Sequence, residues 1–254
     1  MADILNSTIS QSLDTPVHPY YPLGVVIAGY VAKTLSTQEI LGIFTGTCVC
    51  ILGPTFLYLR HARRNLSNSD VLTALWFVLC GFIHLGLEGR FALYLGSYII
   101  YTLGYFALHA RDLASRSTVL AQLWKEYSLS DSRYLTADTF VVCMETVTAV
   151  CWGPLSFAIA WCIASDHPLR HPLQSIVSLG QLYGDVLYYG TCAVDFIAFG
   201  REYSRPELAY YWGYYVFLNA FWIVIPLCLV VSSARETARA FAAVKAGLKA
   251  EKTK

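Results

Sequence analysis

The sequence predicts an all-α membrane protein built as a bundle of five transmembrane helices. Hydrophobic residues make up 56% of its 254 residues, whereas charged residues make up only 14%. Soluble domains contain about 25% charged residues, so this composition is typical of an integral membrane protein. Five segments are also long enough to cross a bilayer, since a spanning helix needs about 20 mainly apolar residues.

The predicted spans are separated by short connections, except between the second and the third. They are residues 40–59, 71–87, 140–164, 173–194 and 210–231. Residues 91–108 are apolar and rich in tyrosine, and their glycines and tyrosines favour an interfacial or re-entrant segment over a sixth span. Residues 122–138 are polar and amphipathic, which predicts a short surface helix followed by a turn.

The basic residues predict the orientation in the membrane. Arginines follow the first span at residues 60–64, and a basic tail follows the last span. Lys and Arg are enriched in cytoplasmic loops, and five spans put both basic segments on that side. We therefore expect a luminal N-terminal segment (1–39), a transmembrane domain (40–233) and a cytoplasmic tail (234–254). The net charge of +1 gives no indication of nucleic-acid binding.

Several polar side chains lie inside the predicted spans. An ionisable group at the centre of a membrane helix costs about 2.5–3.5 kcal/mol on insertion scales, so such groups are candidates for binding or proton chemistry. His84 and Glu88 are four residues apart and share a helix face. Glu145 precedes Thr148 by one turn near the start of the third span. The alternatives are a structural hydrogen bond for the first pair and a solvated interfacial position for Glu145.

The fourth and fifth spans add further candidates. Tyr183 and Asp185 lie among glycines that allow close helix approach, and they form either an interhelical hydrogen-bond knot or part of a substrate-binding site. Asn219 and Trp222 are one turn apart, and the indole is either packed or presented to a cation. No metal site is expected, because no second histidine shares the face of His84. No Ser/His/Asp arrangement indicates a hydrolase.

These side chains together fit a reaction that protonates a hydrocarbon, holds a carbocation and removes a different proton. Eight blocks of the sequence, in one order over most of the chain, also resemble the emopamil-binding protein family. An ordered run of blocks is far more specific than a single motif. The blocks are Cys80-Gly-Phe-Ile-His84 with Glu88, Gln122-Leu-Trp-Lys-Glu-Tyr127, Asp131-Ser-Arg-Tyr134, Cys143-Met-Glu-Thr-Val-Thr148, Trp152-Gly-Pro-Leu155, Asp166-His-Pro-Leu-Arg170, Gly180-Gln-Leu-Tyr-Gly-Asp-Val-Leu-Tyr188 and Phe217-Leu-Asn-Ala-Phe-Trp222.

Members of that family are 3-β-hydroxysteroid Δ8,Δ7-isomerases of the endoplasmic reticulum membrane. The resemblance implies a five-helix bundle around a sterol-sized cavity, a homodimer, and a substrate such as zymosterol or fecosterol. The reaction would need no cofactor, and cationic amphiphilic amines would inhibit it by mimicking the carbocation. The positions that match the family's catalytic residues are His84, Glu88, Glu145, Thr148, Asn219 and Trp222. A further functional block near the site matches Asp131, Arg133 and Tyr134.

Two other functions remain compatible with these residues. One is a non-catalytic sterol or amine receptor of the same superfamily, and the other is an isomerase of a different polycyclic terpenoid. The full set of polar residues favours the sterol isomerase. Arg90 stands where animal members tend to have an aromatic residue, and residues 95–111 are longer and more apolar than in those members. Both departures concern the substrate more than the reaction.

Overall fold

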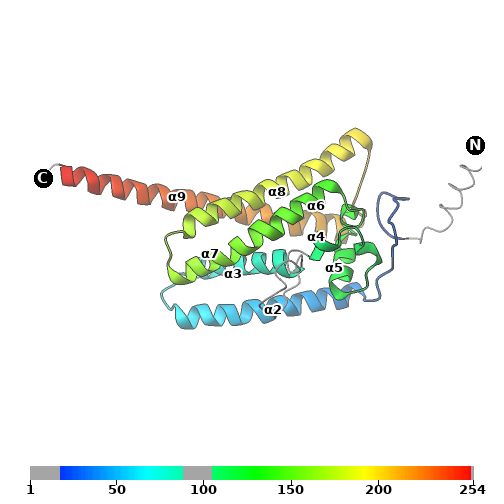
Figure 1. Ribbon diagram of the computed structural model, residues 1–254, viewed down its shortest axis with the longest axis horizontal. Coiled ribbons are helices and arrows are strands. Elements are labelled where there is room, and N and C mark those ends of the chain that lie inside the picture. The colour runs from blue at the N-terminus through cyan, green and yellow to red at the C-terminus, as the bar shows by residue number, and fades with distance from the viewer. Residues whose placement is uncertain (1–17, 88–104, 253–254) are drawn as a thin grey trace, which may run out of the picture.

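The computed structural model describes residues 18–87 and 105–252, and every regular element in these two ranges is helical. The all-α prediction is therefore confirmed for this part of the chain. The long helices lie side by side in an elongated bundle (Figure 1). The elements are α2 (Thr37–Ala62), α3 (Asn68–Phe82), η1 (Ile83–Leu87), α4 (Tyr105–His109), η3 (Leu113–Ser115), α5 (Val119–Tyr127), η4 (Ser132–Tyr134), α6 (Thr139–Val147), η5 (Thr148–Trp152), α7 (Gly153–Ser165), α8 (Arg170–Phe199), η6 (Ala209–Leu218) and α9 (Asn219–Lys252).

Polar side chains that cap the first turn mark the starts of α2, α3 and α6. Ser36 and Glu39 form a capping box at the start of α2, in which each side chain accepts a hydrogen bond from the other's backbone N–H. Ser67 caps α3, and Asp138 caps α6 by accepting from the N–H of Val141 at 3.1 Å. Such caps satisfy N–H groups that have no partner within the helix. These three helices therefore begin where a short polar residue precedes an apolar run, whereas α8 and η6 begin after leucines without a side-chain cap.

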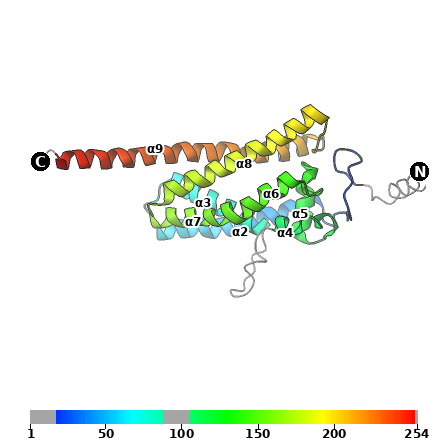
Figure 2. The same ribbon diagram turned by 45° about the horizontal axis from the view of Figure 1, so that its top comes forward.

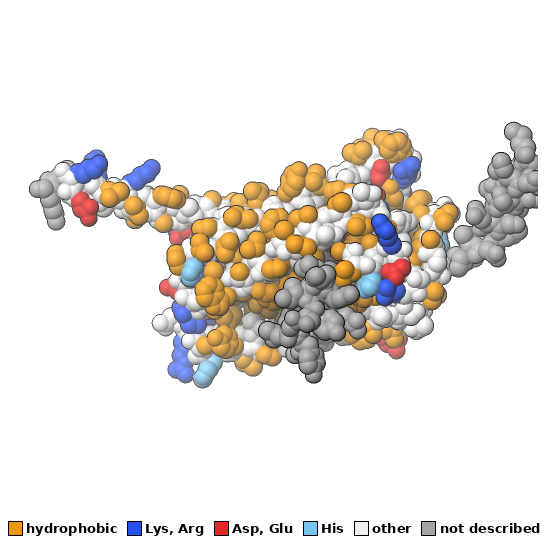
Figure 3. All heavy atoms as spheres, in the orientation of Figure 1, with side chains coloured by type: hydrophobic (Ala, Val, Ile, Leu, Met, Phe, Trp, Pro, Cys, Tyr) orange, Lys and Arg blue, Asp and Glu red, His pale blue; other side chains and the backbone are white. Residues whose placement is uncertain are grey.

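Among residues 18–87 and 105–252, four helical segments are long and apolar enough to cross a membrane. They are Thr37–Ala62, Asn68–Leu85, Thr139–Ser165 and Ala209–Lys252. Each contains most or all of one predicted span. In Figure 3 the hydrophobic side chains cover the middle of the bundle, while the charged side chains lie toward its two ends. This distribution is expected of a protein whose middle faces hydrocarbon.

The remaining predicted span, residues 173–194, forms part of α8, which runs along α9 (Figure 2). α8 has 30 residues but is not among the four apolar segments, because polar side chains occupy its buried face. Those buried side chains are Gln174, Ser178, Gln181, Asp185 and Tyr188. The exposed side chains are largely apolar and include Ile176, Leu179, Val186 and Val194. This polarity is the reverse of that in a soluble bundle.

α5 and η4, together with the turn between them (residues 119–134), close the end of the bundle where α6 begins (Figure 1). We call this buried polar segment the cap. α5 and η4 provide the helix and the turn predicted in residues 122–138, but the prediction of a surface location was wrong. Gln122 is buried, and its Oε1 accepts from the N–H of Thr34 at 2.9 Å. Lys125 is also buried, and its Nζ donates to the carbonyl of Val31 at 2.6 Å. These polar residues are buried because they satisfy the backbone of the segment that crosses over them.

Two further predictions concern the apolar stretch 91–108 and the basic tail. Of the apolar stretch 91–108, only the end is described: α4 packs against α6, with Tyr105 and Phe106 buried. The prediction of an interfacial or re-entrant segment therefore lies mostly outside the described residues, and so does Glu88. The basic tail is helical, because α9 continues to Lys252, well beyond the bundle (Figure 1).

Candidate active site

A cavity of ≈ 280 Å³ lies among the helices beneath the cap. Most of its wall is aromatic or aliphatic, with a few polar side chains from different elements. Its lining residues are Leu41, Phe44, Ile83, His84, Leu123, Trp124, Glu126, Tyr127, Tyr134, Met144, Glu145, Thr148, Trp152, Gly180, Gln181, Gly184, Asp185, Tyr188, Tyr214, Leu218, Asn219 and Trp222. An apolar cavity with a few convergent polar groups is typical of a ligand site.

Five of the six residues predicted to be catalytic lie in this wall, and the sixth, Glu88, lies outside the described residues. The five are His84, Glu145, Thr148, Asn219 and Trp222. They come from η1, from the contiguous α6 and η5, and from α9, three regions that are far apart in the sequence. Two of the residues predicted to bind substrate, Tyr134 and Asp185, also line the cavity.

Glu145 is only 7% exposed, and the hydroxyl of Tyr134 donates a hydrogen bond to its Oε1 at 2.7 Å. Burial and the nearby Glu145 carboxylate both raise the pKa of Tyr134, so this hydroxyl keeps its proton and remains a donor. A carboxylate that accepts a hydrogen bond inside an apolar wall can be held ready for proton transfer at one defined position.

His84 faces the same space from η1. Its ring is buried, and its Nε2 lies 3.5 Å from Nε2 of Gln181 on α8. His84 and Glu145 both line the cavity, so an imidazole and a carboxyl group face the same apolar space. η1 also packs closely on α7, because a Cβ at Gly153 would lie 3.3 Å from the Cβ of His84. Glycine at this position therefore lets the histidine turn approach α7.

Each of three π-helical segments contains or adjoins a predicted catalytic residue. His84 lies in η1, Thr148 begins η5, and Asn219 follows η6 directly. A π turn adds a residue to the helical turn and changes the direction of the side chains that follow it, and such turns are frequent at functional sites. The simple 3.6-residue period used in the sequence analysis does not anticipate these shifts.

Asn219 connects the cap to the last span. Its Oδ1 accepts from the hydroxyl of Tyr127 at 3.1 Å, and its Nδ2 donates to the carbonyl of Tyr215 at 2.8 Å. Trp222 packs its ring against Trp76 of α3, with 5.4 Å between the ring centroids. The indole is therefore supported from behind by a second aromatic ring while it lines the cavity.

The other residues predicted to bind substrate lie elsewhere. Tyr183 is 65% exposed on the outer side of α8 and is not part of the cavity wall. Asp131 and Arg133 form a buried ion pair at 2.7 Å that is also outside the wall. Arg133 donates to Oγ1 of Thr191 at 2.8 Å and lies 5.0 Å from the ring centroid of Tyr188. The pair thus fixes η4, which carries Tyr134, against α8.

Glu126 lines the cavity, but the sequence analysis did not single it out. It is buried and forms an ion pair with Lys33. Its carboxylate also accepts from the hydroxyls of Thr37 at 3.0 Å and Tyr214 at 3.3 Å. Its only sequence signal is its place in the block 122–127, because a glutamate in an amphipathic segment otherwise indicates a solvated surface.

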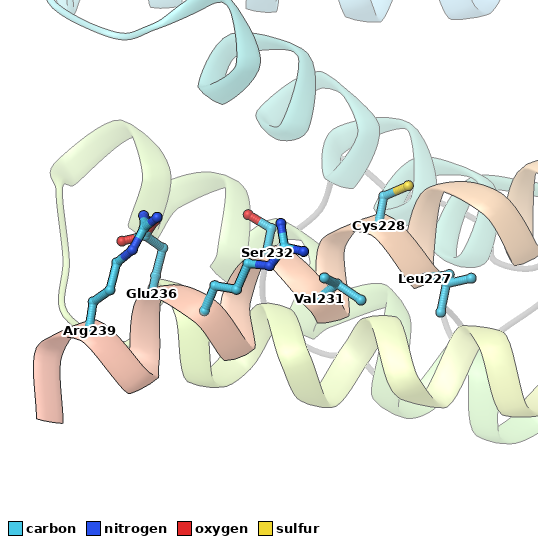
Figure 4. Close-up of a pocket in the computed structure, with 7 residues that line it drawn as sticks. Leu227, Cys228, Val231, Ser232, Glu236 and Arg239 are labelled. Atoms are coloured by element: carbon cyan, nitrogen blue, oxygen red, sulfur yellow. The ribbon is translucent and has the colours of Figure 1, made fainter. Parts of the chain in front are cut away.

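A second pocket, of ≈ 410 Å³, lies on α9 near the point where that helix leaves the bundle. Figure 4 shows its lining side chains, which all come from α9 and include Cys228, Ser232, Glu236 and Arg239. It contains none of the predicted site residues. Within residues 18–87 and 105–252, no three His, Cys, Asp or Glu side chains are grouped so that they could hold a metal ion. The cavity at Glu145 is therefore the candidate site.

The fold and the cavity define a class: a helical membrane protein in which a buried glutamate and a buried histidine line one apolar pocket. The family model EXPERA (EXPanded EBP superfamily) matches residues 119–233. The chain is 42% identical over 219 residues to the 3-beta-hydroxysteroid-Delta(8),Delta(7)-isomerase of Mus musculus, covering 86% of this chain and 87% of the mouse protein. The chain belongs to this EXPERA family.

The plant relatives include proteins named as sterol isomerases and proteins named as isomeliandiol synthases. The chain is 32% identical over 224 residues to a probable 3-beta-hydroxysteroid-Delta(8),Delta(7)-isomerase of Oryza sativa, covering 88% of this chain and 94% of the rice protein. It is also 32% identical over 174 residues to an isomeliandiol synthase of Melia azedarach, covering 68% of this chain and 73% of that protein. The family resemblance predicted from the sequence blocks is thus confirmed.

Proposed function

We propose that this protein is an intramembrane sterol isomerase that shifts a C8=C9 double bond to C7=C8. The strongest support is the cavity that brings His84, Glu145, Thr148, Asn219 and Trp222 together on one apolar wall, in a chain whose relatives include curated Δ8,Δ7-isomerases. A rigid, fused-ring hydrocarbon fits a wall built from aromatic and aliphatic side chains.

In the proposed reaction an acid adds a proton to C9, a carbocation forms at C8, and a base removes a proton from C7. No cofactor takes part. Glu145 and the predicted pair of His84 and Glu88 share the roles of donor and acceptor. Trp222 faces the cation, because the electron-rich face of an indole attracts positive charge. Proton transfer by side chains supplies about 10²–10⁴-fold, so orientation and cation stabilisation supply the remainder.

The same site predicts its inhibitors. An amine that carries a proton on a bulky apolar body resembles the carbocation in both charge and shape. It would place its ammonium group between the Glu145 carboxylate and the Trp222 ring. Tight binding of such amines is thus expected of the native protein, and it is expected to weaken when either side chain is removed.

We propose a fifth span, α8, in addition to the four apolar segments, and the directions of the helices support it. α6 and α7 run together toward the end of the bundle where α8 begins, and α9 runs in the same direction (Figure 1). In the proposed topology the chain returns across the bilayer between them through α8. At 30 residues it is about 45 Å long, and it can cross lipid because its polar face is buried.

α2 ends and α8 begins at the end of the bundle from which α9 extends (Figure 1). Arginines follow or close α2 at residues 60–64, and Arg170 begins α8, which supports a cytoplasmic assignment for that end. The proposed location is the membrane of the endoplasmic reticulum, with the N-terminal segment in the lumen and the protein assembled as a homodimer. The preferred sterol would resemble zymosterol or fecosterol.

A second candidate is an isomerase that acts on another polycyclic terpenoid. The relative named isomeliandiol synthase favours it. The acid–base chemistry would be the same, and the cavity shape would select a different ring system. Incubating the purified protein with a panel of Δ8-sterols and triterpenoids, scored by mass spectrometry, separates the two substrate classes.

The decisive experiment is turnover of a Δ8-sterol in deuterated water by Glu145→Gln and by Glu126→Gln. Both variants replace a buried acid of the same cavity by its amide. Glu145→Gln should abolish deuterium entry into the Δ7 product while the protein still unfolds cooperatively. Glu126→Gln should lose stability, because the Lys33 charge loses its partner, but should still turn over. Normal turnover by Glu145→Gln would refute the proposed role of Glu145.

A further inference from the structure

Six buried polar atoms on α8 have no hydrogen-bond partner among the described residues, including Nε of Arg170 and the hydroxyl of Tyr188, and four of the six lie between these two. These four are Oε1 of Gln174, Oγ of Ser178, Oε1 of Gln181 and Oδ2 of Asp185. The four side chains are at most 9% exposed. Their spacing of four, three and four residues puts them on one face of the helix. We call this row of four side chains the α8 seam.

The seam reaches the candidate site at one end. Gln181 and Asp185 line the cavity, whereas Gln174 and Ser178 do not. Gln181 also brings its Nε2 to 3.5 Å from Nε2 of His84. The row of polar atoms therefore begins beside the proposed acid–base residues and extends along α8 to side chains that lie outside the cavity wall.

The other end of the seam lies near the start of α8. His171, one turn before Gln174, is half-buried, and its Nδ1 lies 3.4 Å from Oγ of Ser233 on α9. Gln174 reaches the same helix, because its Nε2 donates to the carbonyl of Leu229 at 3.5 Å. From residue 171 to residue 185 the helix rises about 21 Å. The seam therefore links the end of the bundle to the cavity.

Interhelical hydrogen bonding does not account for the seam. Polar side chains that join membrane helices pair with a neighbouring helix, yet one polar atom of each of these four side chains is unpaired within the described residues. Buried polar groups without a protein partner are the places where internal water binds, typically with about three hydrogen bonds for each molecule. From residue 174 to residue 185 the helix rises about 16 Å, so a row of about six water molecules at hydrogen-bond spacing would form a continuous chain along these side chains.

We propose that the α8 seam holds a chain of water molecules that carries protons between the end of the bundle at His171 and the cavity. This inference rests on the proposed function. Each isomerisation adds one proton at C9 and removes one from C7, so the reaction consumes no proton overall. It nevertheless leaves the donor without its proton and the acceptor with an additional one. One proton entering along the seam and one leaving restore both groups for the next turnover.

Gln174 and Ser178 are positioning residues in this scheme, because they contact the water and not the sterol. Ser178→Ala and Gln174→Leu remove the polar atoms without touching the cavity wall. Ser156→Ala is the matched control: this serine is also fully buried, but its hydroxyl already donates to the carbonyl of Trp152 at 2.7 Å. The three variants are compared with the native protein for kcat, KM and the solvent deuterium isotope effect.

Both seam variants should lower kcat about tenfold, a part of the 10²–10⁴-fold that proton transfer supplies, with KM unchanged. Their solvent isotope effect on kcat should rise, because proton delivery then limits the rate. Ser156→Ala should match the native protein in all three quantities. Seam variants with the kcat and isotope effect of Ser156→Ala would overturn the proposal, because a purely structural role would not alter proton delivery.

A structural measurement tests the water chain without relying on catalysis. A cryo-electron microscopy map that resolves ordered water should show density bridging Gln174 and Ser178 in the native protein, and less of it in Ser178→Ala. A map that defines both side chains well and shows no water between them would overturn the proposed water chain. If the native protein binds sterol without isomerising it, the proposed function fails, and water in the map still supports the seam.

Discussion

Gly180→Ala probes the contact on which one wall of the cavity depends. A Cβ at residue 180 would lie 2.5 Å from Cζ2, 2.7 Å from Cε2 and 2.9 Å from Cη2 of Trp152. Carbon atoms in proteins approach to about 3.5–4.0 Å, so the indole would have to move by about 1 Å. Trp152 and Gly180 both line the cavity, and the displacement would therefore change the ligand site as well as the helix packing.

The magnitude follows from two opposing effects. Overpacking of this kind costs about 1–3 kcal/mol, whereas Ala favours a helix over Gly by about 0.8–1.0 kcal/mol. Gly184→Ala is the matched control, because Gly184 lines the same cavity on the same helix but its added Cβ would meet only Met144, at 4.0 Å. The helix term cancels between the two variants, which leaves a difference of about 1–3 kcal/mol from packing.

Thermal unfolding in one detergent, followed by intrinsic fluorescence, measures this difference. For a chain of this size, 1 kcal/mol corresponds to about 2–4 °C, so Gly180→Ala should unfold about 2–12 °C below Gly184→Ala. Its affinity for a cationic amphiphilic amine should also fall, while that of Gly184→Ala stays near the native value. Equal melting temperatures and equal affinities would show that Trp152 does not press on α8 as described.

Two further substitutions test how the cap holds the site. Tyr134→Phe removes the donor to Glu145, so it should destabilise the protein by about 1.5–3 kcal/mol, the value of a hydrogen bond to a charged group, and lower kcat. Denaturant unfolding and sterol turnover measure the two effects, and a native kcat would show that this hydroxyl does not orient the carboxylate. Asp131→Asn leaves the Arg133 guanidinium buried without its charge partner and should cost about 3–5 kcal/mol. Asp112→Asn breaks an exposed ion pair and should cost at most about 1 kcal/mol, so similar losses would argue against the importance of burial.

The sequence predicted four of the five spans well, because each of the four is a long apolar run. Long, strongly apolar helices are readable from composition alone. The sequence did not predict the location of α5. The polar side chains of residues 122–138 are typical of a surface. Gln122 and Lys125 are nevertheless buried, because they are the hydrogen-bond partners of backbone groups at residues 34 and 31.

The candidate site was predictable only in part. Helix periodicity gave the shared face of Glu145 and Thr148, and the family resemblance gave the remaining candidates. Neither indicated that the Asp131 and Arg133 pair faces α8 instead of the cavity wall, or that Tyr183 points outward. Within an all-apolar segment, period alone does not tell the lipid-facing side from the protein-facing side.

The sequence by itself determined that this chain is helical and that it enters a membrane. It also determined that its spans contain acids and a histidine, which are energetically costly in contact with lipid. The tertiary structure alone decided which of these groups meet. Glu145 and His84 are 61 residues apart and come together only because glycines let their helices pack closely on neighbours. Burial of the polar face of α8 was likewise settled by packing, since a polar group in hydrocarbon is stable only where another part of the protein, or water, satisfies it.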